Sequence, residues 1–140
     1  MNSSMETYSG NIDFVELCED VLRSNKNIRD VVIIDKHGRP FEKKSKTNLI
    51  HKEKSEMLFM ERALEISMGR DFDDDFGKIN YTFTERDNLS MFSFPMNEFI
   101  VLVTSKSNIS PISVARKISS LLRYYKNFNN DKPSKIEIQI

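Results

Sequence analysis

The chain has few of the residues on which common catalytic and binding motifs depend. Its 140 residues include one cysteine, four glycines and no tryptophan. A single cysteine excludes an internal disulfide and is typical of a reducing compartment. The glycine-rich loops that bind phosphate and dinucleotides are absent, and so is the Gly-x-Ser-x-Gly pattern of serine hydrolases. The sequence therefore predicts a non-enzyme, with no catalytic centre and no bound cofactor.

An excess of charge of one sign is also lacking. Lysine and arginine together number 21, and so do aspartate and glutamate, so the net charge is zero. A neutral chain has no bulk attraction to nucleic acid or to an anionic membrane. No apolar run approaches the length of about 18 residues that indicates a membrane span, and the N-terminus lacks the basic and apolar segments of a secretory signal. We expect a cytoplasmic protein without a nucleic-acid or membrane partner.

The composition is that of a folded domain. Hydrophobic residues make up 39% of the chain and charged residues 30%, which is typical of globular rather than disordered proteins. The length suits one domain. We expect a flexible N-terminus at 1–11, a single domain at 12–126 and a C-terminal tail at 127–140. Ile136, Ile138 and Ile140 alternate in that tail, which is the pattern of a short extra strand.

The spacing of apolar residues predicts the secondary structure of the domain. Apolar residues three or four positions apart indicate helices, and alternating or continuous β-branched runs indicate strands. The expected elements are, in order, a helix at 12–25, strands at 31–34 and 39–42, a helix at 53–71, strands at 78–85, 89–94 and 99–105, and a helix at 111–125. A polar, basic connector at 43–54 precedes the second helix, and Gly77 ends the acidic segment that follows it.

The same patterns predict the order of the strands. Strands 31–34 and 99–105 are apolar on both faces, which indicates central strands that are covered on both sides. Strand 78–85 alternates, and Pro40 confines the short strand 39–42 to an edge. An antiparallel sheet of order 2-1-5-4-3 satisfies these constraints. We expect an α+β sandwich with the first and third helices on one face of the sheet and the second helix on the other.

This order of elements, together with several short motifs, carries a resemblance to a known fold. The motifs are Phe14 to Leu22, Ile28-Arg29, Lys36-His37-Gly38-Arg39, Glu56 to Met60, Arg70-Asp71-Phe72-Asp73, Gly77-Lys78 and Phe94-Pro95-Met96. Over most of residues 12–106 the chain resembles a family of small uncharacterised archaeal proteins with the roadblock (dynein light chain) fold, a relative of the profilin-like fold. The sequence departs from that pattern at Gly69, where a basic residue is expected.

The second helix has more apolar surface than one sheet face needs. Its apolar residues cover an arc of roughly 200° at 100° per residue, whereas a stripe of about 100° suffices to cover a sheet. We expect a homodimer formed by this helix and the strand that follows it. The predicted interface consists of Met57, Met60, Leu64, Met68, Ile79, Tyr81 and Phe83. In the alternative, the C-terminal strand of the same chain covers the surplus, and the protein is a monomer.

The residues that resemble metal or catalytic sites do not complete one. Asp71, Asp73 and Asp75 have the spacing of a calcium loop, but the glycine falls one place late and Thr82 stands where glutamate is needed. The two histidines lack a ligand at metal-binding spacing. Cys18 lies on the apolar face of the first helix, where a buried thiol is inert. We expect no metal site.

One cluster of basic residues remains. It consists of Lys43, Lys44, Lys46, Lys52 and Lys54, together with His51. This cluster is either an electrostatic contact patch for an acidic partner or phosphate, or a solvated loop. The polar side of the last helix also carries basic residues, which we interpret as a solvated face: Arg116, Lys117, Arg123 and Lys126.

Two classes of function fit these observations. The resemblance implies a non-catalytic homodimeric interaction module, because roadblock-type modules often regulate small GTPases or act as scaffolds of protein complexes. The alternative is a sensor domain of the PAS or GAF kind, since mixed helix and sheet domains of this size can hold a small ligand. A sensor needs a cavity with converging polar groups. Phenylalanines along the predicted strands indicate a filled interior instead.

Overall fold

The computed structural model describes residues 12–46 and 52–127. The elements are α2 (Phe14–Arg23), β1 (Ile28–Asp35), β2 (Pro40–Ser45), α3 (Lys52–Gly69), the 3-10 helix η1 (Arg70–Phe72), α4 (Asp73–Phe76), β3 (Thr82–Glu85), β4 (Ser90–Met96), β5 (Phe99–Ser105) and α5 (Pro111–Asn127). The types and order of the five strands and of the helices α2, α3 and α5 agree with the prediction, whereas the short helices η1 and α4 were not predicted. The predictions for residues 1–11 and for the tail from 128 onward lie outside the described residues.

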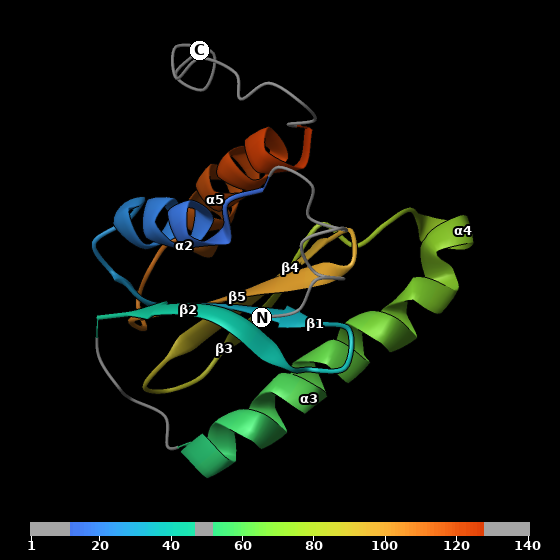
Figure 1. Cartoon of the computed structure of the whole chain (residues 1–140), viewed down its shortest axis with the longest axis horizontal. Coiled ribbons are helices and arrows are strands. Elements are labelled where there is room, and N and C mark those ends of the chain that lie inside the picture. Colours follow the sequence, from blue (N-terminus) through green and yellow to red (C-terminus); the bar gives the residue numbers. More distant parts are fainter. Residues whose placement is uncertain (1–11, 47–51, 128–140) are drawn as a thin grey trace.

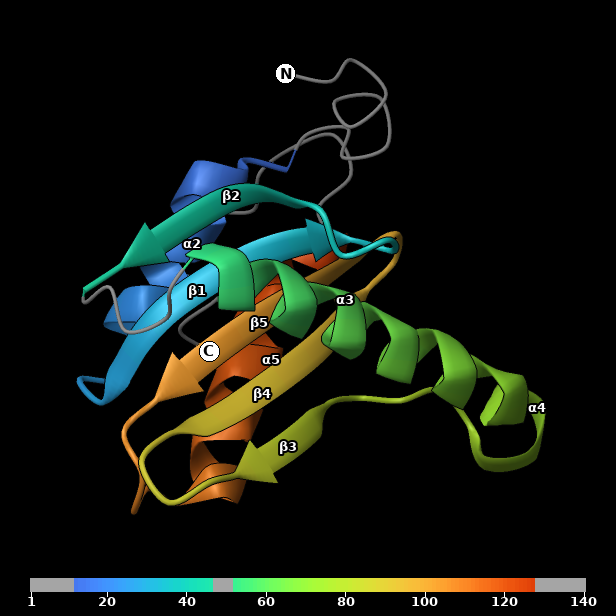
Figure 2. The ribbon, with the colours of Figure 1, turned by 90° about the horizontal axis from the view of Figure 1, so that it is seen from below.

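The five strands form one antiparallel sheet of order β2-β1-β5-β4-β3, which confirms the predicted order. Helices α2 and α5 lie on one face of the sheet, and α3 crosses the other face (Figures 1 and 2). β1 and β5 are central, and every residue of β5 is buried. The α+β fold with helices on both faces is therefore confirmed.

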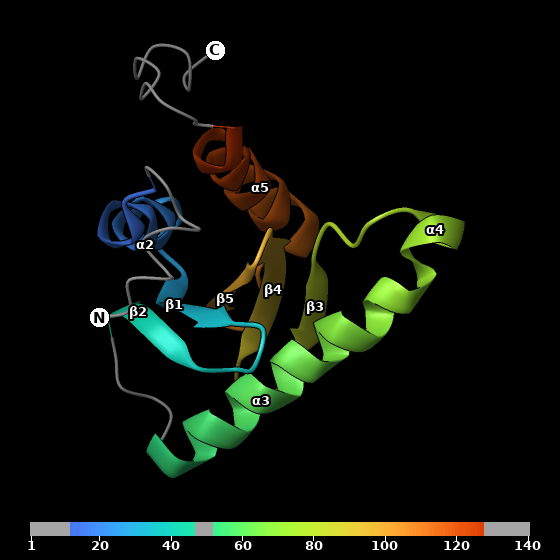
Figure 3. The same ribbon diagram turned by 45° about the vertical axis from the view of Figure 1, so that its right-hand side comes forward.

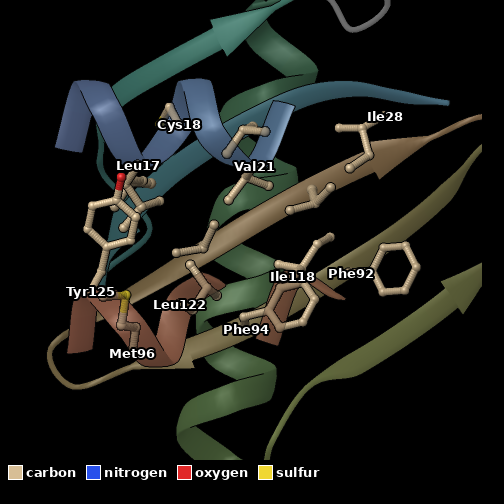
Figure 4. Packing of buried hydrophobic residues seen from close by; sticks show 14 of the residues in the cluster. Leu17, Cys18, Val21, Ile28, Phe92, Phe94, Met96, Ile118, Leu122 and Tyr125 are labelled. Atoms are coloured by element: carbon tan, nitrogen blue, oxygen red, sulfur yellow. The ribbon is translucent and has the colours of Figure 1, made fainter. Parts of the chain in front are cut away.

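The larger core lies between the sheet and the helices α2 and α5. The side chains of Phe92 and Phe94 on β4 point into it, as do Leu17 on α2 and Ile118 on α5 (Figure 4). All four of these residues are less than 2% exposed. Side chains alternate along a strand, so every second residue of the central strands points to the opposite face of the sheet, where a second core forms.

The smaller core lies between the sheet and α3. It consists of Val32, Ile34, Phe59, Ala63, Ile66, Ile100 and Leu102. The continuous apolar runs of β1 and β5 thus divide between the two cores, which is why these strands lack a polar face.

Only β5 has the bounds that the sequence predicted. β1 begins at Ile28 rather than 31, and β4 ends at Met96 rather than 94. β2 extends to Ser45 instead of ending at 42, because it stays paired with β1 along its length, and an edge strand can expose its polar side chains. β3 begins at Thr82 rather than 78, and its pairing with β4 ends at Ser93. Pro95 lies two residues beyond that point and has no N–H to donate, so it suits a strand edge that is left open.

The turn between β1 and β2 packs directly against α3. Asp35 Oδ1 accepts hydrogen bonds from the backbone N–H groups of His37 (2.8 Å) and Arg39 (3.0 Å), which fixes the turn. Gly38 is buried with φ +85°, and a Cβ atom placed on it would lie 2.8 Å from the Cα of Met60. Only glycine allows this backbone contact between the hairpin and the helix.

Candidate protein interface

The outer side of α3 carries a row of exposed apolar side chains, here called the α3 stripe. It consists of Met57 (73% exposed), Met60 (62%), Leu64 (59%) and Met68 (61%). These positions are three or four residues apart, so their side chains follow one side of the helix. The helix is the long green element in Figure 3, and it runs past the edge of the sheet.

The α3 stripe lies nearly opposite the buried side of the helix. At 100° per residue its four positions span about 80°, and their centre is about 140° from that of Phe59, Ala63 and Ile66. The predicted arc of about 200° is therefore two stripes, one of which packs on the sheet. Within the described part of the chain, nothing covers the other. A free apolar row of this kind is typical of a protein interface.

The predicted interface residues beyond α3 are placed differently. Ile79 is partly buried and packs against the smaller core, next to α3. Tyr81 and Phe83 pack into the larger core on the opposite face of the sheet, where the ring centroid of Phe83 is 4.8 Å from that of Phe92. The seven predicted residues thus do not form one surface. The chain is a paired strand only from Thr82 onward, so Ile79 does not follow the alternation that would place it on the same face as Tyr81 and Phe83.

The edge of β3 stays available for pairing. β3 is the last strand of the sheet, and among the described residues no strand pairs with it on the side away from β4. An open strand edge can pair with the same edge of a second molecule.

The predicted basic patch is divided by the sheet. Lys44 lies toward α2, with its Nζ 3.6 Å from Glu19 Oε2, and Lys46 Nζ donates a hydrogen bond to the carbonyl oxygen of Lys26 (3.5 Å). Lys43 and Lys54 are exposed. Lys52 begins α3, but its side chain lies outside the described part. Among the described lysines, Lys44 and Lys46 thus contact different partners, and the structure shows no single converging site.

Beyond α3 the chain forms a short acidic arm at the end of the helix (Figure 3). Phe72 and Phe76 are exposed on this arm, and their rings stack with centroids 5.9 Å apart. Asp71, Asp74 and Asp75 are exposed, and within 12–46 and 52–127 no group of three or more acidic, histidine or cysteine residues is placed to hold a metal ion.

Three polar contacts tie the domain together and were not anticipated from the sequence. Buried Asp30 on β1 accepts hydrogen bonds from the hydroxyls of Ser45 and Thr104 (2.6 Å for Thr104), which links β2, β1 and β5. The phenol of Tyr125 on α5 donates to Asp20 on α2. An isolated aspartate within a β-branched run was the one sequence signal for the first contact, since a buried carboxylate needs donors.

A third contact joins α3 to the edge strand. The guanidinium of Arg62 donates to Thr84 Oγ1 on β3 (3.2 Å) and forms ion pairs with Glu61 (3.3 Å) and Glu65 (3.2 Å). The Arg62 side chain is only 11% exposed. This contact holds α3 beside β3. It therefore fixes the position of the α3 stripe relative to the open edge of β3.

The environment of Cys18 fits an inert thiol. Cys18 is fully buried, and burial, with a smaller contribution from Glu42, raises the pKa of its thiol to about 12. Burial and the hydrogen bond to Asp20 also raise the pKa of the Tyr125 phenol. A buried thiol with a pKa raised this far stays protonated at neutral pH.

The raised pKa of Cys18 predicts a loss of stability in alkaline solution. The unfolded thiol titrates near 9.0 and the folded thiol near 12, so the unfolded state loses its proton first. The free energy of unfolding should therefore fall by about 1.4 kcal/mol between pH 8 and pH 10 from this group alone. Urea titrations at both pH values measure the change, and Cys18→Ala should remove that part of it. An equal fall in the variant would contradict the assignment.

Comparison with solved structures identifies the fold. A roadblock/LC7 domain from Streptomyces avermitilis superposes with a TM-score of 0.63 at 12% sequence identity, covering 79% of this chain and 92% of that one. The gliding protein MglB from Thermus thermophilus gives a TM-score of 0.61 at 12% identity, covering 80% and 87%. Profilin II from Acanthamoeba castellanii gives 0.59 at 9% identity, covering 81% and 97%.

Scans against protein-family models and curated proteins found no significant match. Among the described helices, none is long and apolar enough to cross a membrane. The structural similarity extends over about four fifths of the chain and includes nearly all of each similar domain. The chain therefore has the roadblock fold, related to that of profilin.

Proposed function

We propose that this protein is a non-catalytic interaction module that forms a homodimer through the α3 stripe and the neighbouring edge of β3. The single observation that carries the proposal is the row of four exposed apolar side chains on the outer side of α3. Soluble domains rarely expose a continuous apolar row without a partner, and two-fold homodimers are the commonest assemblies. Three of the four side chains are methionines, whose flexible thioethers adapt to a self-complementary contact.

The module acts, in this proposal, on another protein in the cytoplasm, with a small GTPase as the first candidate. Support comes from the fold, since the superposed structures include MglB and a roadblock/LC7 domain, and from the resemblance of the sequence to roadblock-type modules. Membership of the small archaeal family that the sequence resembles is part of the same proposal. A sensor function has less support, because the space on both faces of the sheet is filled by apolar side chains.

Leu64→Glu tests the dimer. At micromolar concentration, light scattering of the wild type should give about twice the 16.4 kDa of one chain. A glutamate at the centre of the α3 stripe would be buried without a partner, so the variant should have the mass of one chain. Ile112→Glu is the matched control, because Ile112 is also 59% exposed but lies on α5, across the sheet. It should keep the wild-type mass.

Two results would contradict the dimer. One is a wild-type mass of a single chain, and the other is an equal loss of mass in both variants.

The proposed action on a small GTPase is tested separately, by measuring the rate of GTP hydrolysis by purified small GTPases from the same organism. We expect wild-type protein to change the rate of one of them, and unchanged rates with all of them would overturn this step alone.

A further inference from the structure

A second surface, separate from the α3 stripe, has an unusual concentration of positive charge. A groove of about 960 Å³ runs between α5 on one side and the end of α3 with its acidic arm on the other. Figure 3 shows the flanking elements, with the end of β4 and the chain leading to β3 between them. Five cationic side chains line the groove: Arg70, Lys78, Arg116, Arg123 and Lys126. Asp73 is the one acidic residue among its lining residues.

None of these cations forms an ion pair within the described part of the chain. The ion pairs found there involve Arg23, Lys44 and Arg62, and none involves a cation of the groove. Arg70 donates one hydrogen bond, to the backbone oxygen of Asn97 (3.2 Å). In a chain of zero net charge, five unpaired cations around one concave surface create a local positive potential that attracts an anionic ligand.

The groove is long and has an apolar component. Its lining on α5 reaches from Ile112 to Lys126, which is about 21 Å at 1.5 Å per residue. Ile112, which is 59% exposed, and the partly buried Ile79 add apolar surface. An extended peptide of about six residues would span this length at roughly 3.3 Å per residue.

One wall of the groove is an unpaired stretch of strand. Residues 94–96 of β4 line it, and the pairing of β4 with β3 ends before them, at Ser93. Their backbone groups on that side lack a strand partner among the described residues, so they can bond to the backbone of an extended ligand, although Pro95 offers only its carbonyl.

We propose that this groove binds an acidic, extended peptide segment of a partner protein. The cations would pair with its carboxylates, and the apolar lining would take the side chains that alternate with them. The length of the groove favours a peptide over a compact small molecule. The unpaired backbone of residues 94–96 favours a peptide over nucleic acid, because an extended peptide can bond to it through its own backbone.

The probe for the test is a fluorescein-labelled octapeptide of alternating glutamate and leucine, measured by fluorescence anisotropy. We expect it to bind the wild-type protein more weakly as salt is added, since the contacts are exposed. A reference peptide with glutamine in place of glutamate should bind at least about tenfold more weakly. The double variant Arg116→Glu with Arg123→Glu should reduce affinity for the acidic peptide by at least the same factor.

The control is Lys106→Glu with Lys117→Glu, which changes the net charge equally at exposed lysines that do not line the groove. This variant should bind the acidic peptide within about twofold of the wild type. Equal losses in both double variants, equal binding of the glutamine peptide, or no binding at about 1 mM would overturn the proposal. So would an oligonucleotide that displaces the peptide and binds more tightly. All four substitutions lie away from the α3 stripe, so light scattering of both double variants should give the same mass as the wild type. A failure of the peptide proposal can therefore be distinguished from a failure of the dimer proposal.

Discussion

Replacing Gly38 with alanine should lower the free energy of unfolding by about 2–4 kcal/mol. Two costs combine at this position. The φ angle of +85° is unfavourable for a residue with a side chain, and the new methyl group would lie 2.8–2.9 Å from backbone atoms of Phe59 and Met60. The backbone of α3 cannot yield as a flexible side chain would, so the helix or the hairpin must move. Urea denaturation at one fixed protein concentration measures the loss.

Gly77→Ala separates the two costs. Gly77 has nearly the same φ, +86°, but a Cβ atom there would meet no atom within 4 Å. With ψ 169°, Gly77 has an extended, positive-φ conformation that is essentially restricted to glycine. This variant should therefore lose only the conformational part, about 1–3 kcal/mol. If both variants lost the same free energy of unfolding, the close contact between the hairpin and α3 would add no cost to the substitution. Our account of Gly38 would then be wrong.

Replacing Phe92 with alanine should cost about 3–5 kcal/mol. Phe92 is fully buried on β4, as is Phe94 (Figure 4), and its ring centroid is 5.9 Å from that of Phe94 and 6.4 Å from that of Tyr81. Removing the ring leaves a cavity that these neighbours, held by the strands, can fill only in part. A shift of the urea midpoint with an unchanged slope would show that stability alone has changed.

Phe76→Ala is the control for this loss. Phe76 is 82% exposed on the acidic arm, so its removal creates no cavity and should change the free energy of unfolding by less than about 0.5 kcal/mol. A comparable loss in the two variants would show that the arm, rather than the core, stabilises the fold.

The arrangement of the sheet could be predicted because local patterns carry it. β1 and β5 are apolar on both faces, and a strand of that kind is stable only where both faces are covered, so these two had to be central. The last helix begins where Pro111 predicted it would. These conclusions depend on neighbouring residues in the sequence and need no knowledge of tertiary contacts.

The interface and the groove depend on contacts between distant segments. The side taken by Phe83 follows from the register between β3 and β4, in which Phe83 pairs with Phe92, and the sequence of β3 alone does not contain that register. Tyr81 precedes β3 and packs on the same face as Phe83. Arg116 and Arg123 were interpreted as a solvated face, because their helix alone shows no partner. They face Arg70 and Lys78 across one groove only when α5 and the end of α3 come together in the fold.

The pairing of β1 with β5 sets the order in which this chain can fold. Asp35 pairs with Phe99 and Ile28 with Ser105, so the centre of the sheet joins two distant parts of the sequence, whereas β4 and β5 are separated by a short turn. Closing a long loop costs more entropy than closing a short one. On the ribosome, β1 must therefore wait, with its apolar residues uncovered, until β5 has emerged. Translation of this segment is the period in which the nascent chain is most prone to aggregate.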